Sequence, residues 1–236
     1  MDVKRLYILI GLGLFVGWMW RSNIQASTLP PTTSSTAVPS TSAPTTPVPV
    51  EFPCVLGNAG LIVTDIVSFE GITPESEEEE FVIDALALLI YNPGKTSFTT
   101  VTITLSRGEE TLYFDLEYLP AGSRVLVVER NHSPYGSGEF DSCECISFLP
   151  EAFPLSQSQL QITYQNGSLA VENVSDIPFS SVTIYYKAYS PQDNLYVGGK
   201  AMSVFFGSLQ PGESKCLSAY GYAEPYSRIT AVIIHP

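Results

Sequence analysis

Histidine and cysteine offer the clearest chemistry in this chain, and both are scarce. The 236 residues include two histidines and four cysteines. His132 lies in the turn-like segment Asn-His-Ser-Pro-Tyr, and His235 is the penultimate residue. No Gly-x-Ser-x-Gly motif, which would expose a nucleophilic serine, occurs in the sequence. We therefore predict no catalytic residue and expect that the protein is not an enzyme.

Cys143 and Cys145 form a Cys-x-Cys pair, a spacing that occurs in metal and redox sites. A structural zinc ion needs four ligands, and the other cysteines and histidines are scattered along the chain. The acidic run at Glu75 and Glu77 to Glu80 does not fit a calcium loop, which places Asp, Asn and Gly at alternating positions. We predict no metal and no cofactor, and we interpret the acidic run as a solvated loop.

Tyrosines crowd the C-terminal part of the chain, and their rings can stack on sugars or contact proteins. Four of them, Tyr185, Tyr186, Tyr189 and Tyr196, are a possible binding face. The alternative is that they belong to the core or to edge strands, because alternate residues of a strand point to opposite sides.

The charge balance limits the ligands of the protein. The formal net charge is −13, from 24 acidic and 11 basic residues, which disfavours nucleic acid and anionic lipid headgroups as the main partner. Charged residues make up only 15% of the chain, while 13 Tyr and 12 Phe are present. This profile is typical of β-sheet rather than of long surface helices.

The N-terminus has the features of an export signal. Lys4 and Arg5 precede fifteen uncharged residues, Leu6 to Trp20, which are long for a signal-peptide core and short for a spanning helix. The inner positive charges and the outer tryptophans favour a retained single-pass anchor, with the rest of the chain outside the cell membrane. Cleavage after Ala26, which would give a secreted protein, is the alternative. Residues 1–26 are thus a signal-anchor or a signal peptide.

Residues 27–50 contain seven Thr, five Ser and six Pro and no charge. Such a composition cannot form a core, so we predict an extended, exposed linker.

The rest of the chain contains an internal repeat. The segment Asn92 to Ile103 matches Asn173 to Ile184 without a gap, and Phe98 corresponds to Phe179. Further matching blocks follow in the same order: Leu119-Pro-Ala-Gly122 with Leu209-Gln-Pro-Gly212, and Ser133-Pro-Tyr135 with Glu224-Pro-Tyr226. We therefore predict two copies of one module, at 51–150 and 151–236.

Each copy has the pattern of a β-sandwich. In the second copy Val182, Ile184 and Tyr186 alternate with polar or small residues, and Asn-, Pro- and Gly-containing turns separate the apolar runs. The segment Glu77 to Leu89 has good helix formers, but it aligns with a stretch of the second copy that is too short for a helix. We predict a strand there and an all-β fold of two tandem β-sandwich domains.

The Asn turn, the Leu-x-x-Gly turn and the run Val182-Thr-Ile-Tyr-Tyr-Lys-Ala-Tyr189 resemble the FxLYD-type and related immunoglobulin-like modules of bacterial surface proteins. The resemblance covers Leu169 to Ser214 and Leu88 to Gly122. It implies extracytoplasmic, immunoglobulin-like sandwiches with no established catalytic residues.

Export permits disulfide bonds. Cys54, at the start of the first module, can reach its last strand, so we predict a disulfide with Cys143 or Cys145. Cys216 aligns with Leu126 of the first copy, and this position predicts a buried free thiol.

Two hypotheses on function remain open. The first is a non-enzymatic, membrane-anchored surface protein whose tandem sandwiches serve display or protein interaction. The second is a carbohydrate- or ligand-binding module that uses the tyrosines of the second domain. The expected partners are the membrane, through Leu6 to Trp20, and an unknown surface protein or glycan.

Overall fold

The computed structural model describes residues 49–73, 81–136, 138–151, 158–165 and 167–236. All the regular secondary structure in these residues is β-strand, so the all-β prediction is confirmed. The predicted export segment and the linker up to residue 48 lie outside the described residues. Within the described part of the chain, no helix is long and apolar enough to cross a membrane.

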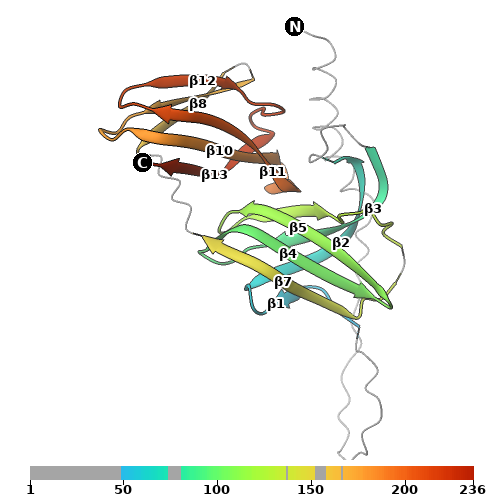
Figure 1. The fold of residues 1–236 in the computed structure, drawn as a ribbon. Helices are drawn as coiled ribbons and strands as arrows, with labels where there is room; N and C mark the ends of the chain where they lie inside the picture. The colour runs from blue at the N-terminus through green and yellow to red at the C-terminus, as the bar shows by residue number, and fades with distance from the viewer. Residues whose placement is uncertain (1–48, 74–80, 137, 152–157, 166) are drawn as a thin grey trace, which may run out of the picture. The chain divides into compact units, whose positions relative to one another are not determined.

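The thirteen strands of the described residues form three sheets (Figure 1). They are β1 Cys54–Leu56, β2 Leu61–Ile72, β3 Phe81–Tyr91, β4 Ser97–Arg107, β5 Glu110–Leu119, β6 Arg124–Val128, β7 Ser142–Glu151, β8 Leu160–Gln165, β9 Ser168–Asn173, β10 Phe179–Ser190, β11 Leu195–Leu209, β12 Ser214–Ser218 and β13 Ser227–His235. The seven-stranded sheet has the order β1-β2-β3-β6-β11-β10-β13, and the two three-stranded sheets have the orders β5-β4-β7 and β12-β9-β8.

Two hydrophobic cores lie between these sheets. The first is formed by β1, β2, β3 and β6 on one side and by β5, β4 and β7 on the other, with Phe114 and Ile103 fully buried at its centre. Figure 1 shows the two layers, with β4, β5 and β7 in front of β1 and β2. The second core lies between β11-β10-β13 and β12-β9-β8, around Tyr186 and Ile184. Both cores have the face-to-face packing of a β-sandwich.

The buried position of strand β3 explains why residues that favour helices occur in the segment Glu77 to Leu89. Its residues from Ala85 to Ile90 are all buried, so both faces of this part of the strand are covered, and β2 and β6 flank it within the sheet. A strand that is covered on both faces needs apolar residues at every position and loses the period of two. The prediction of a strand is confirmed from Phe81 onward, and residues 74–80 of the acidic run lie outside the described residues.

The repeated asparagine of the first module, Asn92, is a buried structural residue. The Asn92 Nδ2 group donates hydrogen bonds to the carbonyl oxygens of Thr96, at 2.9 Å, and Pro120, at 3.1 Å. Its Oδ1 atom accepts a hydrogen bond from the backbone nitrogen of Gly94 at 3.1 Å. The side chain thereby ties the β3–β4 turn to the end of β5.

Asn173 makes similar contacts in the second repeat, with one acceptor shifted by a residue, because Leu209 aligns with Leu119 rather than with Pro120. Its Nδ2 group donates to the carbonyl oxygens of Ile177, at 2.8 Å, and Leu209, at 3.2 Å, and its Oδ1 atom accepts from the backbone nitrogen of Ser175 at 3.0 Å. Asn173 is fully buried. The gapless alignment of the two repeats therefore corresponds to matching hydrogen bonds.

The two repeat phenylalanines also occupy matching positions. Phe98 is 4% exposed and pairs with Leu119, and Phe179 is 3% exposed and pairs with Leu209. The two aligned phenylalanines are therefore both core residues.

The repeats differ in the surroundings of one strand. Strand β6 lies inside the seven-stranded sheet, where Val125 and Leu126 pair in parallel with Tyr196 and Val197 of β11. Its counterpart β12 is an edge strand. Leu126 is therefore buried, whereas the aligned Cys216 is exposed. The prediction of a buried thiol at Cys216 is wrong, because its local sequence does not show that the outer face of β12 lacks a neighbour.

Candidate functional site

The first sandwich carries an open groove with a volume of about 680 Å³. The segment that enters β1, the β2–β3 hairpin and the chain between β6 and β7 contribute its walls. We call it the acidic groove, and its lining residues are Val50, Phe52, Asp65, Ile66, Asp84, Tyr135, Gly136, Gly138, Glu139 and Phe140.

Three carboxylates face this groove, from Asp65, Asp84 and Glu139. Asp84 has a left-handed backbone with φ 54°, in the irregular stretch where β3 changes its register against β2. Its Oδ1 atom accepts a hydrogen bond from the Ser68 hydroxyl at 2.8 Å, and its backbone oxygen accepts one from the Tyr135 nitrogen at 2.7 Å. These contacts in the irregular stretch of β3 hold Asp84 beside Tyr135, which lies on the groove wall formed by the chain between β6 and β7.

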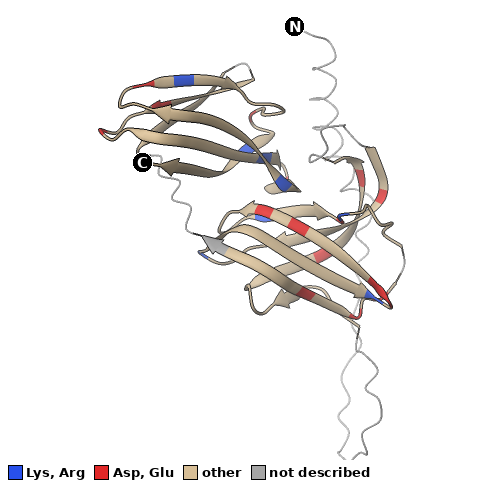
Figure 2. Cartoon of the chain, in the orientation of Figure 1, with Lys and Arg blue, Asp and Glu red and all other residues tan. Residues whose placement is uncertain are grey.

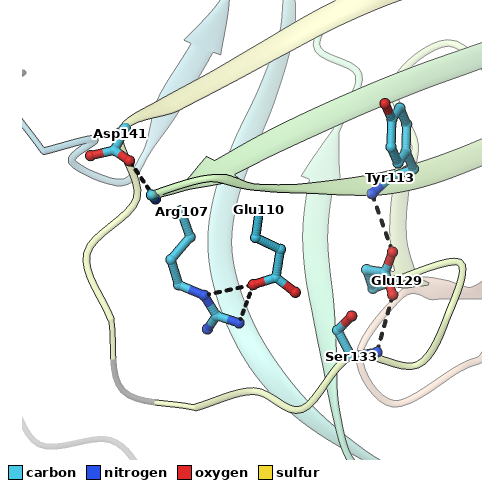
Figure 3. A network of polar contacts seen from close by, with 7 residues as sticks. Arg107, Glu110, Tyr113, Glu129, Ser133 and Asp141 are labelled. Atoms are coloured by element: carbon cyan, nitrogen blue, oxygen red, sulfur yellow. Dashed lines mark hydrogen bonds and ion pairs between the residues drawn. The ribbon is translucent and has the colours of Figure 1, made fainter.

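The buried Glu129 shapes the chain that leads to this wall (Figure 3). The Glu129 carboxylate is 1% exposed and accepts hydrogen bonds from the backbone nitrogens of Asn131, at 2.8 Å, Ser133, at 3.1 Å, and Tyr113, at 3.3 Å. Three donors compensate the cost of burying its charge. They also hold the turn that precedes Tyr135 against β5.

Arg107 supports the other end of the wall (Figure 3). Its guanidinium binds the Glu110 carboxylate at 2.9 Å and lies 5.8 Å from the centre of the Phe140 ring. The Asp141 carboxylate accepts a hydrogen bond from the Gly108 nitrogen at 2.7 Å. A Cβ atom at Gly138 would lie 2.9 Å from Arg107 Cδ, so only glycine fits there without a shift of that side chain.

The lining of the acidic groove favours a cationic ligand. No lysine or arginine is among its lining residues, and Arg107 beside it is paired with Glu110. Phe52, Tyr135 and Phe140 add aromatic surface, which attracts cations at the ring faces. Acidic side chains are also spread over the strands of the first sandwich (Figure 2). Among the described residues, no cluster of His, Cys, Asp or Glu could hold a metal ion.

The four tyrosines of the possible binding face do not share one exposed surface. Tyr186 is 1% exposed and donates its hydroxyl hydrogen bond to the Tyr220 carbonyl at 2.7 Å, and Tyr189 is 5% exposed. The Tyr185 ring stacks on Tyr118 of β5, with 3.9 Å between the ring centres. Tyr196 pairs with β6 and contacts the Tyr189 ring edge-on.

The buried tyrosines predict a loss of stability at alkaline pH. Burial raises the pKa of Tyr186 to about 12, and burial together with the nearby Glu224 carboxylate raises the pKa of Tyr222. The folded protein binds these protons more tightly than the unfolded chain, in which a tyrosine titrates near about pH 10. Their contribution to stability is complete below about pH 10 and is lost as the pH rises toward 12.

We expect the free energy of unfolding to fall by at most about 1.4 kcal/mol per pH unit for each such tyrosine above about pH 10. Urea titrations at pH 8 to 11 measure this slope. Tyr222→Phe removes the titrating group and should make the slope shallower, while Tyr226→Phe, at an exposed tyrosine, should leave it unchanged. Equal slopes for all three proteins would contradict the assignment.

The remaining sequence candidates are not among the residues that line the acidic groove. His132 has a left-handed backbone with φ 56° in the turn after β6, and His235 is exposed at the end of β13. The four cysteines are free thiols. The Cys145 thiol is buried and donates a hydrogen bond to the Ser147 carbonyl, with 3.4 Å between sulfur and oxygen.

Sequence reasoning missed the residues of the acidic groove. Asp65, Asp84 and Glu139 are separated along the chain and form no motif. The one local signal was the single aspartate inside the apolar run Phe-Val-Ile-Asp-Ala-Leu, because Asp is disfavoured within strands.

Comparisons of the chain with protein families, with curated proteins and with solved structures find no match.

Proposed function

We propose that the protein is a non-enzymatic, extracytoplasmic surface protein that acts by binding another protein. In this proposal Leu6 to Trp20 anchors the chain in the membrane, residues 27–50 form the linker, and 51–150 and 151–236 are tandem immunoglobulin-like β-sandwich domains. The order of an apolar segment behind Lys4 and Arg5 supports export. The matching roles of the repeat asparagines support two related domains.

The acidic groove is the observation that carries the binding role. It combines three carboxylates with three aromatic rings on an open surface. Such a surface suits a basic peptide segment of a partner, because carboxylates attract Lys and Arg and the rings pack against their apolar stems. The groove is also lined by Val50, the last residue of the linker, and by Phe52, which follows it closely.

Carbohydrate binding by the tyrosines has less support. Tyr186 and Tyr189 are buried, and Tyr185 is stacked against Tyr118. A sugar-binding face requires several rings that are exposed side by side.

Intact cells that express the full chain provide the test. The probe is a fluorescent fifteen-residue peptide of alternating Lys and Ser, compared with the same peptide carrying Gln in place of Lys. We expect the Lys peptide to bind to intact cells and the Gln peptide to bind much less. The triple variant Asp65→Asn, Asp84→Asn, Glu139→Gln should weaken Lys-peptide binding roughly tenfold, because each exposed ion pair contributes about 0.2 to 1 kcal/mol.

A second triple variant controls for the net charge. Glu109→Gln, Glu144→Gln and Asp176→Asn remove three exposed carboxylates outside the groove lining. Equal losses for the two triple variants would show non-specific attraction and contradict the groove. Binding that appears only after the cells are permeabilised would contradict export.

A further inference from the structure

Cys54 and Cys143 lie side by side at the edge of the first sandwich. Cys54 is on β1, an edge strand of the seven-stranded sheet, and Cys143 is on β7, an edge strand of the sheet opposite. The two strands are in contact, and the Cys54 thiol lies near enough to Cys143 to affect the pKa of its thiol. Cys143 is partly buried against the first core.

Two hydrogen bonds join the segment that contains Cys54 to the segment that contains Cys143, one before and one after the cysteines. Before it, the Val50 nitrogen donates to the Phe140 carbonyl at 2.7 Å. After it, the Asn58 side-chain amide donates to the Cys145 carbonyl at 2.7 Å. The two segments are therefore held together on either side of the thiols, so a bond between the sulfurs requires little movement of the backbone.

The other two cysteines do not compete for this position. Cys145 points into the core and its thiol donates to the Ser147 carbonyl. Cys216 is exposed on β12, a strand that belongs to the second core rather than the first. Of the other cysteines, Cys54 has the larger effect on the pKa of the Cys143 thiol and Cys145 the smaller.

We propose that Cys54 and Cys143 are a disulfide-forming pair and that Cys145 and Cys216 stay reduced. A disulfide, such as oxidised glutathione or that of an oxidoreductase, is the oxidant. The Cys54 thiolate attacks one of its sulfurs and a mixed disulfide forms, while the first thiol leaves. The Cys143 thiolate then attacks the Cys54 sulfur, the second thiol leaves, and the two protons from the cysteines end on the two released thiols.

The surroundings of Cys143 explain this order. Burial raises the pKa of the Cys143 thiol, and the neighbouring Cys54 raises it further. Cys143 is thus the poorer first nucleophile. Once Cys54 is in the mixed disulfide, its charge no longer opposes ionisation of Cys143, which favours the second step.

The bond would connect the first strand of the sandwich to its last. Strand β1 has only three residues and follows the linker. In a membrane-anchored protein, a pull on the linker reaches β1 first, and a link to β7 would prevent this short strand from peeling away. This consequence depends on the proposed anchor, whereas the bond itself does not.

Peptide mapping of the purified full chain in mild detergent tests the pairing. The protein is incubated with oxidised glutathione, its free thiols are alkylated, and a glutamate-specific protease cuts after Glu144, between the two neighbouring cysteines. We expect a disulfide-linked peptide pair that contains Cys54 and Cys143, with Cys145 and Cys216 alkylated. A link through Cys145, or alkylated Cys54 and Cys143, would overturn the proposal.

The effect on stability is a second measurement. The disulfide closes a long loop that includes β2 to β6, so a reductant should lower the Tm of the oxidised protein by about 10 °C. Cys54→Ser together with Cys143→Ser should abolish this reductant effect, and Cys216→Ser should retain it. A reductant effect that persists in the double variant would also overturn the pairing.

Discussion

Replacement of Asn173 by alanine is expected to lower the free energy of unfolding by about 3 to 5 kcal/mol. The side chain is fully buried, and its loss leaves the Leu209 carbonyl and the Ser175 nitrogen without their side-chain partner and deprives the Ile177 carbonyl of one donor. Each buried polar group that loses its partner costs about 1 to 3 kcal/mol. Urea unfolding followed by far-ultraviolet circular dichroism measures the change.

Two further variants test this interpretation. Asn92→Ala should have an effect of similar size, because Asn92 makes the equivalent hydrogen bonds in the first repeat. Asn131→Ala, at an exposed side chain, should change the stability by less than about 0.5 kcal/mol. A loss below about 1 kcal/mol in Asn173→Ala would mean that water or a local shift replaces the side chain.

Truncation of either repeat phenylalanine should be comparably severe. Phe98→Ala and Phe179→Ala are each expected to cost about 3 to 5 kcal/mol, because each removes a buried ring and leaves a cavity in its core. Phe98 also contacts the Phe148 ring edge-on at a centre distance of 6.0 Å. The same urea titrations provide the free energies.

Phe205 is the matched control for this pair. It lies on β11 and is 65% exposed, so Phe205→Ala should cost less than about 0.5 kcal/mol. If Phe98→Ala and Phe205→Ala lowered the free energy of unfolding by equally small amounts, the first core would have to close around the missing Phe98 ring. If only one of the two buried rings mattered, the equivalence of the repeats would not extend to their energetics.

Strand β3 shows how far the sequence could be interpreted. Single-residue propensities alone favoured a helix at Glu77 to Leu89, and the alignment with the second repeat identified a strand. The repeat was decisive because equivalent sequences with the same flanking turns fold into the same local structure. For the same reason the positions of Asn92, Asn173, Phe98 and Phe179 could be predicted.

The acidic groove, and which of the tyrosines are buried, could not be predicted from the repeat. Asp65 and Asp84 line the same groove from the paired strands β2 and β3, at different points along them, because Asp65 pairs with Leu89, and Glu139 reaches the groove from the chain between β6 and β7. Tyr186 is buried because its strand lies over β9 in the second core. Periodicity shows that neighbouring tyrosines point to opposite sides, but it does not show which sides are covered.

By itself, the sequence determined the all-β class, the repeated turns and the matching Asn and Phe positions of the two repeats, because alternation, turn chemistry and repetition act over a few residues. Only the tertiary structure decided that Leu126 is buried while the aligned Cys216 is exposed, and that Cys143 rather than Cys145 meets Cys54. Those outcomes depend on which strand becomes the neighbour of another: β6 gains β11 on its open side, and β12 remains an edge. Strand pairing over such distances is set by the packing of whole sheets, which no short segment of sequence contains.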